Sequence, residues 1–195
     1  MVLAIDTALD ACSVAIVRGD AVLADLSERM QRGQAERLAP MVREVTASAS
    51  VVFSELDRIA VTTGPGSFTG VRVGLSFARA LALALGKPCI GVSTLEALAL
   101  QEGEEGLRGS LIETPGAAYC ALYENGAPLA APRGIAHGEH EAVLSEAASG
   151  RAFVLTGANV VVNAVALARR ATRLDPVKYT PDPLYLRAPH VTLPA

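Results

Sequence analysis

Residues 58–85 read RIAVTTGPGSFTGVRVGLSFARALALAL. The first four residues, Arg58–Val61, are predicted to form a strand, and the Gly86-Lys87-Pro88 that follows the stretch is a clear helix stop. Between these points the pattern predicts a loop over residues 62–69 and a helix over residues 70–85. A strand, a glycine-containing loop and a long apolar helix therefore form the central unit of the predicted fold.

The loop, Thr63-Gly64-Pro65-Gly66-Ser67-Phe68-Thr69-Gly70, is the strongest local motif. Glycines before a helix N-terminus can let backbone N–H groups approach a phosphate. However, a Walker loop needs a lysine where Val71 stands, and a dinucleotide fingerprint needs a glycine where Thr69 stands. The spacing around Ser67 also misses that of a nucleophile elbow. We therefore favour a tight turn in which Ser67 or Thr69 caps the helix.

The helix over residues 70–85 is apolar on nearly every side. At about 100° per residue, one face is predicted to pack on a sheet. It consists of Gly70, Gly74, Phe77, Ala78, Leu81 and Leu85. The opposite face holds Arg72, Ser76, Arg79 and Leu83. A helix that is apolar nearly all round needs cover on both sides, either from another helix of the chain or from another protein. We favour a partner protein.

Upstream of this unit, the chain opens with predicted strands over residues 2–5, 12–17 and 21–26, the last two joined by a Gly19-Asp20 hairpin turn. A helix over residues 34–49 follows, with a kink or a late start expected at Pro40. Downstream lie a strand over residues 88–92 and a helix over residues 94–101. The order β-β-β-α-β-α-β-α is that of a ribonuclease-H-like half, the unit that actin-like ATPases and sugar kinases use twice.

The second half repeats the opening more faintly, after a Gly- and Glu-rich boundary at residues 102–109. Strands are predicted over residues 110–113, 118–123, 129–135 and 153–155, and helices over residues 138–148 and 159–170. A proline-rich tail over residues 175–195 reads as extended. The sequence thus predicts an α/β protein with two actin-like (ASKHA) lobes, at residues 1–101 and 110–195, the second of them reduced.

Composition excludes several classes of function. The 195 residues are 51% hydrophobic and only 19% charged, below the roughly 25% usual for soluble domains. The net charge of -3 lacks the basic excess typical of nucleic-acid binding, and we interpret Arg169, Arg170 and Arg173 as the basic end of a helix. Three unevenly spaced cysteines, no signal peptide and no apolar run near the ~18 residues of a membrane span predict a cytoplasmic protein.

The residues that an actin-like ATPase needs are incomplete in this chain. Asp6 stands where such enzymes hold their first phosphate loop, but the following turn, Ala8-Leu9-Asp10-Ala11, has no glycine. The second half offers Glu113 and an isolated Gly157 where an aspartate and a paired-glycine loop are expected. The pair His137 and His140 has no further ligand at metal-binding spacing. We therefore predict no catalytic residue, cofactor or metal in this chain.

Several blocks resemble the TsaB (YeaZ) family, a subunit of the bacterial machinery that makes threonylcarbamoyladenosine in tRNA. They are Leu3-Ala4-Ile5-Asp6-Thr7-Ala8, Ala11-Cys12-Ser13-Val14-Ala15, Glu36-Arg37-Leu38-Ala39-Pro40-Met41-Val42, residues 63–74, Gly91-Val92-Ser93-Thr94-Leu95 and Pro183-Leu184-Tyr185-Leu186-Arg187. The chain departs from the family at three places. Histidine is frequent in the family where Gln34 stands, and the family carries a longer segment in place of residues 113–116. The stretch at residues 157–183 is shorter than is usual in the family.

The resemblance implies two actin-like lobes and no catalysis by this chain alone. It implies a homodimer, or a heterodimer with the related catalytic subunit TsaD, joined by the first two helices. A TsaE-type ATPase would complete the complex, and tRNA would be reached only through it. The predicted partner interface comprises Leu38, Met41, Val42, Val45, Arg72, Val73, Ser76, Arg79, Ala80 and Leu83. The alternative is a free-standing actin-like kinase of small molecules, or a hydrolase.

Overall fold

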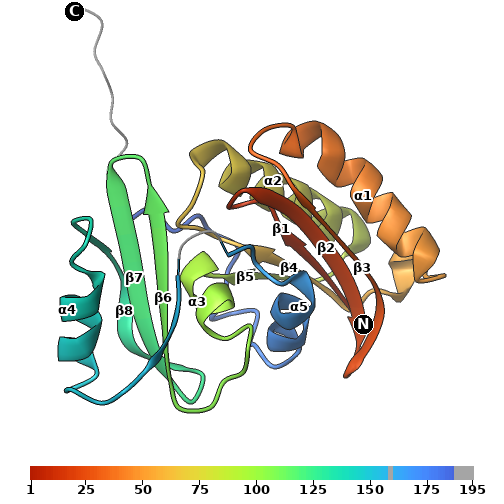
Figure 1. The fold of residues 1–195 in the computed structure, drawn as a ribbon. Coiled ribbons are helices and arrows are strands. Elements are labelled where there is room, and N and C mark those ends of the chain that lie inside the picture. The colour runs from red at the N-terminus through yellow and green to blue at the C-terminus, as the bar shows by residue number, and fades with distance from the viewer. Residues whose placement is uncertain (158–159, 187–195) are drawn as a thin grey trace, which may run out of the picture.

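The computed structural model describes residues 1–157 and 160–186 (Figure 1). Its first sheet has the strand order β3-β2-β1-β4-β5, from β1 (Val2–Asp6), β2 (Ala11–Arg18), β3 (Ala21–Arg29), β4 (Arg58–Thr62) and β5 (Cys89–Val92). The first three strands are antiparallel neighbours, whereas β4 runs parallel to β1 and β5 parallel to β4. This is the ribonuclease-H-like arrangement that the element order predicted.

The second sheet repeats four of these five positions. Its order is β8-β7-β6-β9, from β6 (Leu107–Thr114), β7 (Ala117–Glu124), β8 (Ala127–Ile135) and β9 (Val154–Thr156). The strands β6, β7 and β8 are antiparallel, and β9 lies parallel to β6 as β4 lies parallel to β1. The described residues add no fifth strand to this sheet, which agrees with the predicted reduced second lobe.

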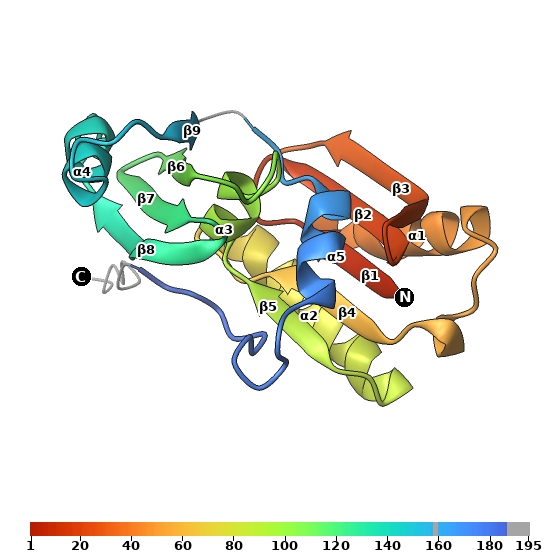
Figure 2. The ribbon, with the colours of Figure 1, turned by 90° about the horizontal axis from the view of Figure 1, so that it is seen from below.

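Helices cover both sides of the first sheet (Figures 1 and 2). On one side, α1 (Gln34–Ser48) packs on β2 and α2 (Phe68–Leu85) on β4. On the other side lie α5 (Ala164–Thr172), packed on β1 and β2, and α3 (Thr94–Ala99), which also contacts β6 and β7. The helix α4 (His140–Ala147) covers the outer side of the second sheet. Two core clusters separate at the first sheet, because β1 sends Leu3 and Ile5 to one side and Val2 and Ala4 to the other.

The C-terminal part of the chain differs in detail from its prediction. The last helix was expected from Asn159, which lies outside the described residues, and it begins at Ala164 because the Asn163 side chain accepts hydrogen bonds from the N–H groups of Val165 and Ala166. The helix α5 then packs on the first sheet, where Arg58 donates to the carbonyl oxygens at its end. The boundaries 1–101 and 110–195 therefore stay a prediction.

Candidate partner interface and the neighbouring cleft

The glycine loop before α2 is explained by close packing of backbone. A Cβ atom at Gly66 would lie 2.3 Å from the carbonyl oxygen of Ala8, and one at Gly70 would lie 2.1 Å from that of Thr7. The Thr7 hydroxyl donates to the Gly70 carbonyl at 2.7 Å, which fixes the first turn of α2 on the end of β1. The Ser67 side chain accepts from the Gly70 N–H, so the predicted capped turn is confirmed, with Ser67 as the cap.

The long helix α2 buries one side and exposes the other. Its buried residues are Gly70, Val71, Gly74, Leu75, Ala78 and Ala82. The predicted inward residues Phe77, Leu81 and Leu85 are only half-buried, so the buried arc is turned from the predicted one. On the outer side Leu83 is 85% exposed and Phe68 51% exposed. Among the predicted interface residues on α2, Arg72, Ser76, Arg79, Ala80 and Leu83 are exposed and Val73 is half-buried.

The four predicted interface residues on α1 lie elsewhere. Leu38, Met41, Val42 and Val45 are each at most 2% exposed and belong to the core cluster between α1, α2 and the first sheet. They form the single apolar stripe of an amphipathic helix, and that stripe packs on the helix's own sheet first. In the isolated chain these four residues therefore lie beneath the surface, whereas the α2 residues reach it; that all ten form the partner interface stays a prediction.

By length and composition alone, α2 could cross a membrane, with 18 residues and a mean hydropathy of 1.4. From the sequence we predicted no apolar run of this length. Core helices of soluble proteins meet the same measure, and α2 packs along β4 with its first turn fixed to the end of β1. The hydropathy therefore describes a helix that is apolar over its whole length, buried and exposed sides together.

A segment from the far end of the chain lies beside α2. We call residues 179–186 the C-terminal strap. The Leu184 N–H donates to the Thr63 carbonyl at 2.8 Å, which seats the strap on the glycine loop. From the strap, the Tyr185 hydroxyl accepts a hydrogen bond from Arg72 Nε at 3.1 Å, and its ring lies 6.0 Å from the Phe68 ring. The strap thus adds aromatic surface to the N-terminal end of the exposed α2 face.

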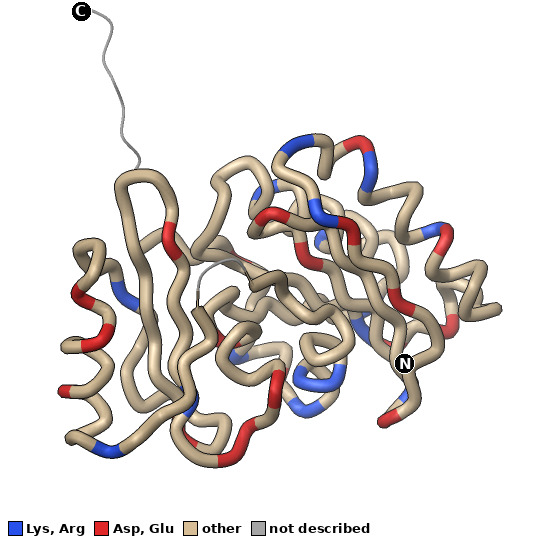
Figure 3. Tube along the Cα trace, in the orientation of Figure 1, with Lys and Arg blue, Asp and Glu red and all other residues tan. Residues whose placement is uncertain are grey.

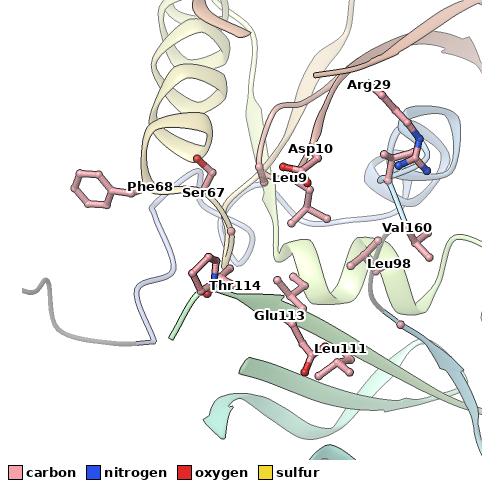
Figure 4. Close-up of a pocket in the computed structure, with 16 residues that line it drawn as sticks. Leu9, Asp10, Arg29, Ser67, Phe68, Leu98, Leu111, Glu113, Thr114 and Val160 are labelled. Atoms are coloured by element: carbon pink, nitrogen blue, oxygen red, sulfur yellow. The ribbon is translucent and has the colours of Figure 1, made fainter. Parts of the chain in front are cut away.

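A cleft of about 650 Å³ opens between the two sheets (Figure 4). Leu9 and Asp10 come from the β1–β2 turn, Leu98 from α3, and Leu111 and Glu113 from β6. Carboxylates from both lobes, those of Asp10 and Glu113, line it, although Arg29 also reaches it. Two carboxylates at this position disfavour a polyphosphate by like-charge repulsion. The cleft is therefore poorly matched to the nucleotide that actin-like enzymes hold between their lobes.

The carboxyl group of Asp6, the candidate remnant of a phosphate site, is fully buried. Its Oδ1 atom accepts from Thr62 Oγ1 at 2.6 Å and from the Ala8 N–H at 3.2 Å. Its Oδ2 atom has no partner among the described residues. Burial raises the pKa of this carboxyl to about 6, against the smaller opposing effect of its two hydrogen bonds. Asp6 does not line the cleft.

His137 and the three arginines of the basic cluster have local partners, whereas the buried Nδ1 atom of His140 has none among the described residues. His137 Nδ1 lies 3.4 Å from Glu113 Oε1, and the described part of the chain holds no group of three metal-ligating side chains. The three arginines of the basic cluster bind within the chain, Arg169 to the Asp20 carbonyl, Arg170 to Glu96 and Arg173 to Glu104. Lys and Arg positions are scattered among acidic ones along the trace (Figure 3). The reading of the arginines as a helix end is thus confirmed.

Comparisons with known proteins agree with this architecture. A family model described as TsaD, tRNA N6-adenosine threonylcarbamoyltransferase, matches residues 26–120. The tRNA threonylcarbamoyladenosine biosynthesis protein TsaB of Escherichia coli K12 is 38% identical over 148 residues, which make up 73% of this chain and 62% of that protein. The tRNA N6-adenosine threonylcarbamoyltransferase of Erythrobacter litoralis is 52% identical over 69 residues, 35% of this chain and 20% of that protein.

A solved structure described as YeaZ from Pseudomonas aeruginosa matches with a TM-score of 0.70 and 27% identity, over 95% of this chain and 99% of that one. Two sheets with a shared strand order therefore define an actin-like (ASKHA) α/β protein with a reduced second lobe. Within that class, the chain belongs to the TsaB (YeaZ) family. It spans less than two thirds of the length of the curated TsaB relatives, 62% in Escherichia coli and 41% in Haemophilus influenzae.

Proposed function

We propose that this chain is a non-catalytic scaffold and dimerization subunit of the bacterial complex that makes threonylcarbamoyladenosine in tRNA. In this role it binds and activates the catalytic TsaD subunit, works in the cytoplasm, and reaches tRNA only through the complex. A TsaE-type ATPase is the third member. Membership of the TsaB family supports this proposal, since the Escherichia coli relative is named for the same biosynthesis.

The exposed outer face of α2 is the observation that carries the proposal. The Leu83 side chain is 85% exposed, and covering it with a partner would stabilise the complex by roughly 1.5–3 kcal/mol through the hydrophobic effect. Along the same face the exposed Ala80 lets another backbone approach closely, and the helix contains no acidic residue that would need water. A face that combines an exposed leucine with alanine and arginine, and no acidic residue, resembles the mixed surface of a protein interface.

The choice of TsaD as partner is supported by kinship between the two proteins. The family model that matches residues 26–120 is that of TsaD, and a threonylcarbamoyltransferase shares 52% identity with this chain over 69 residues. Related lobes have related surfaces, so a heterodimer can use the helix pairing that a homodimer would use. A resting homodimer would use the same pairing less favourably, because Arg72 and Arg79 of the two copies would meet, and would exchange one copy for TsaD.

The non-catalytic role is supported by the geometry of the cleft. Asp6 is enclosed by its own lobe, and Asp10 and Glu113 line the space that phosphates would occupy. We therefore assign the transferase activity to the partner, and to this chain the role of providing a binding surface for that partner.

The test is co-purification with the TsaD-type subunit of the same organism, followed by a tRNA modification assay with and without this chain. We expect Ala80→Arg and Leu83→Arg to weaken association by at least about 100-fold, because each places an unpaired charge in an apolar contact. Val177→Arg is the matched control, since Val177 is 83% exposed on the loop after α5 and outside the proposed interface. Normal association of both α2 variants would show that the interface lies elsewhere.

A further inference from the structure

The guanidinium group of Arg72 is held in place by two aromatic side chains. Its Cζ atom lies 3.7 Å from the centroid of the Phe68 ring, and its Nε donates to the Tyr185 hydroxyl at 3.1 Å. The first contact comes from the preceding turn of α2 and the second from the C-terminal strap. The strap is itself fixed by the hydrogen bond from Leu184 to Thr63. The side chain is therefore ordered before any partner arrives, although it is exposed.

The terminal nitrogens of Arg72 have no partner among the residues that the structure describes. Neither Nη atom has an ion pair or hydrogen bond to any residue that the structure describes. The neighbouring Arg79 does face a carboxylate, that of Asp182 at 3.9 Å, but both of those side chains are more than half exposed. A planar guanidinium with two free Nη atoms presents a fork of parallel donors that matches a carboxylate.

We propose that Arg72 is the charged anchor of the partner interface and binds a carboxylate of the TsaD-type subunit, with Tyr185 as its positioning residue. This inference rests on the proposed function and adds the chemistry of the partner surface to it. Arginine and tyrosine are enriched among the residues that dominate binding energy at interfaces, and a preordered side chain loses less entropy on binding.

Charge complementarity favours a different chain over a second copy at this position. The face of α2 and the strap carries the cations Arg72 and Arg79 against one carboxylate, that of Asp182, and α2 has no acidic residue. A two-fold contact centred on α2 would bring the two sets of arginines together. A partner that offers an acidic side chain instead meets the cation with its opposite charge.

Affinity of the full chain for the TsaD-type subunit, measured by titration calorimetry at roughly 50 and 500 mM salt, tests this inference. We expect Arg72→Gln to weaken binding by about tenfold or more and to flatten its salt dependence. Arg72→Lys is expected to weaken binding but keep the salt dependence, since an ammonium lacks the fork. Tyr185→Phe, which removes only the hydroxyl, is expected to fall between wild type and Arg72→Gln.

The matched control is Arg18→Gln, an exposed arginine at the end of β2, which should bind as wild type does. Circular dichroism and thermal unfolding of each variant check that the fold is intact. The inference is overturned if Arg72→Gln binds within twofold of wild type, or if it weakens only self-association or only tRNA binding. If the wild-type chain itself fails to bind the TsaD-type subunit, the proposed function is overturned as well.

Discussion

At the scale of single residues, Asp6 is the clearest case of a carboxyl group enclosed by the core of the protein. It ends β1 at the place where an actin-like ATPase holds its first phosphate loop, yet its carboxyl is fully buried and only its Oδ1 atom has partners. The Oδ2 atom is without a partner in the described part of the chain. A carboxylate enclosed in this way costs folding free energy when it is ionised.

This burial predicts a particular dependence of stability on pH. The pKa of Asp6 is about 6 in the folded chain and 3.8 ordinarily, so the folded state binds the proton more tightly than the unfolded state. The stability contributed by protonation is complete below pH 3.8 and is lost as the pH rises through about 6. We expect wild type to lose about 3 kcal/mol over this range relative to Asp6→Asn, measured by urea unfolding at a series of pH values. Parallel profiles for the two proteins would contradict this assignment.

Individual residues were predicted from sequence where the signal was local. The cap at Ser67 was found because capping needs only a hydroxyl just before a helix, and the close glycines around it follow from the same turn. The partner of Tyr185 could not be found, because Arg72 lies 113 positions away in the chain. No pattern along the sequence reports a hydrogen bond between segments that the fold alone brings together.

At the scale of elements, a cluster around Arg170 ties together parts of both sheets. From α5, its guanidinium pairs with Glu96 of α3 at 3.0 Å and with Glu104 of the connecting loop at 3.4 Å, and it donates to the Gly126 carbonyl in the β7–β8 turn at 2.9 Å. The Glu96 side chain is only 10% exposed. Burial raises the pKa of Glu96, and the charge of Arg170 partly offsets that rise.

Removing one charge of this cluster should therefore cost more than removing two. We expect Arg170→Met to destabilise the chain by about 3–5 kcal/mol, because it leaves Glu96 buried without its cation. The double variant with Glu96→Gln should recover a large part of that loss, since the amide carries no charge to desolvate. Urea unfolding measures both, and limited proteolysis of the loop at residues 101–106 reports whether the two sheets separate locally. Equal losses in the single and double variants would show that the ion pair is not the cause.

The periodicity of helices predicted their presence better than their orientation. In α2 nearly every residue is apolar, so two overlapping faces fit the same spacing, and packing between the sheet and α1 selects the one containing Val71 and Leu75. In α1 the stripe with Leu38 and Met41 was clear, but the sequence cannot say whether a stripe faces its own sheet or a partner. In the folded chain that stripe is buried against the first sheet and α2.

At the scale of the whole molecule, strand order was predictable and the path of the tail was not. The succession of strands and helices specifies a ribonuclease-H-like sheet because hairpins and right-handed crossovers leave few alternatives. The return of α5 and the C-terminal strap to the first sheet depends on contacts such as Gly91 N–H to the Tyr179 carbonyl, which no local signal announces. The predicted tail beyond Leu186 lies outside the described residues.

The arrangement of the two lobes also separates the proposed scaffold from a free-standing kinase or hydrolase. An actin-like enzyme must wrap phosphates with glycine-containing hairpin turns, whereas the β1–β2 turn here has no glycine and its Ala8 carbonyl already accepts the Ser67 N–H at 2.8 Å. With Asp10 and Glu113 lining the cleft, we expect the isolated chain to bind ATP more weakly than about 1 mM by calorimetry. Asp6→Ala should then leave the signal unchanged, because this carboxyl does not line the cleft. Tight binding by the chain alone that Asp6→Ala abolishes would instead place a working phosphate site at the end of β1, and the enzyme hypothesis would replace the scaffold.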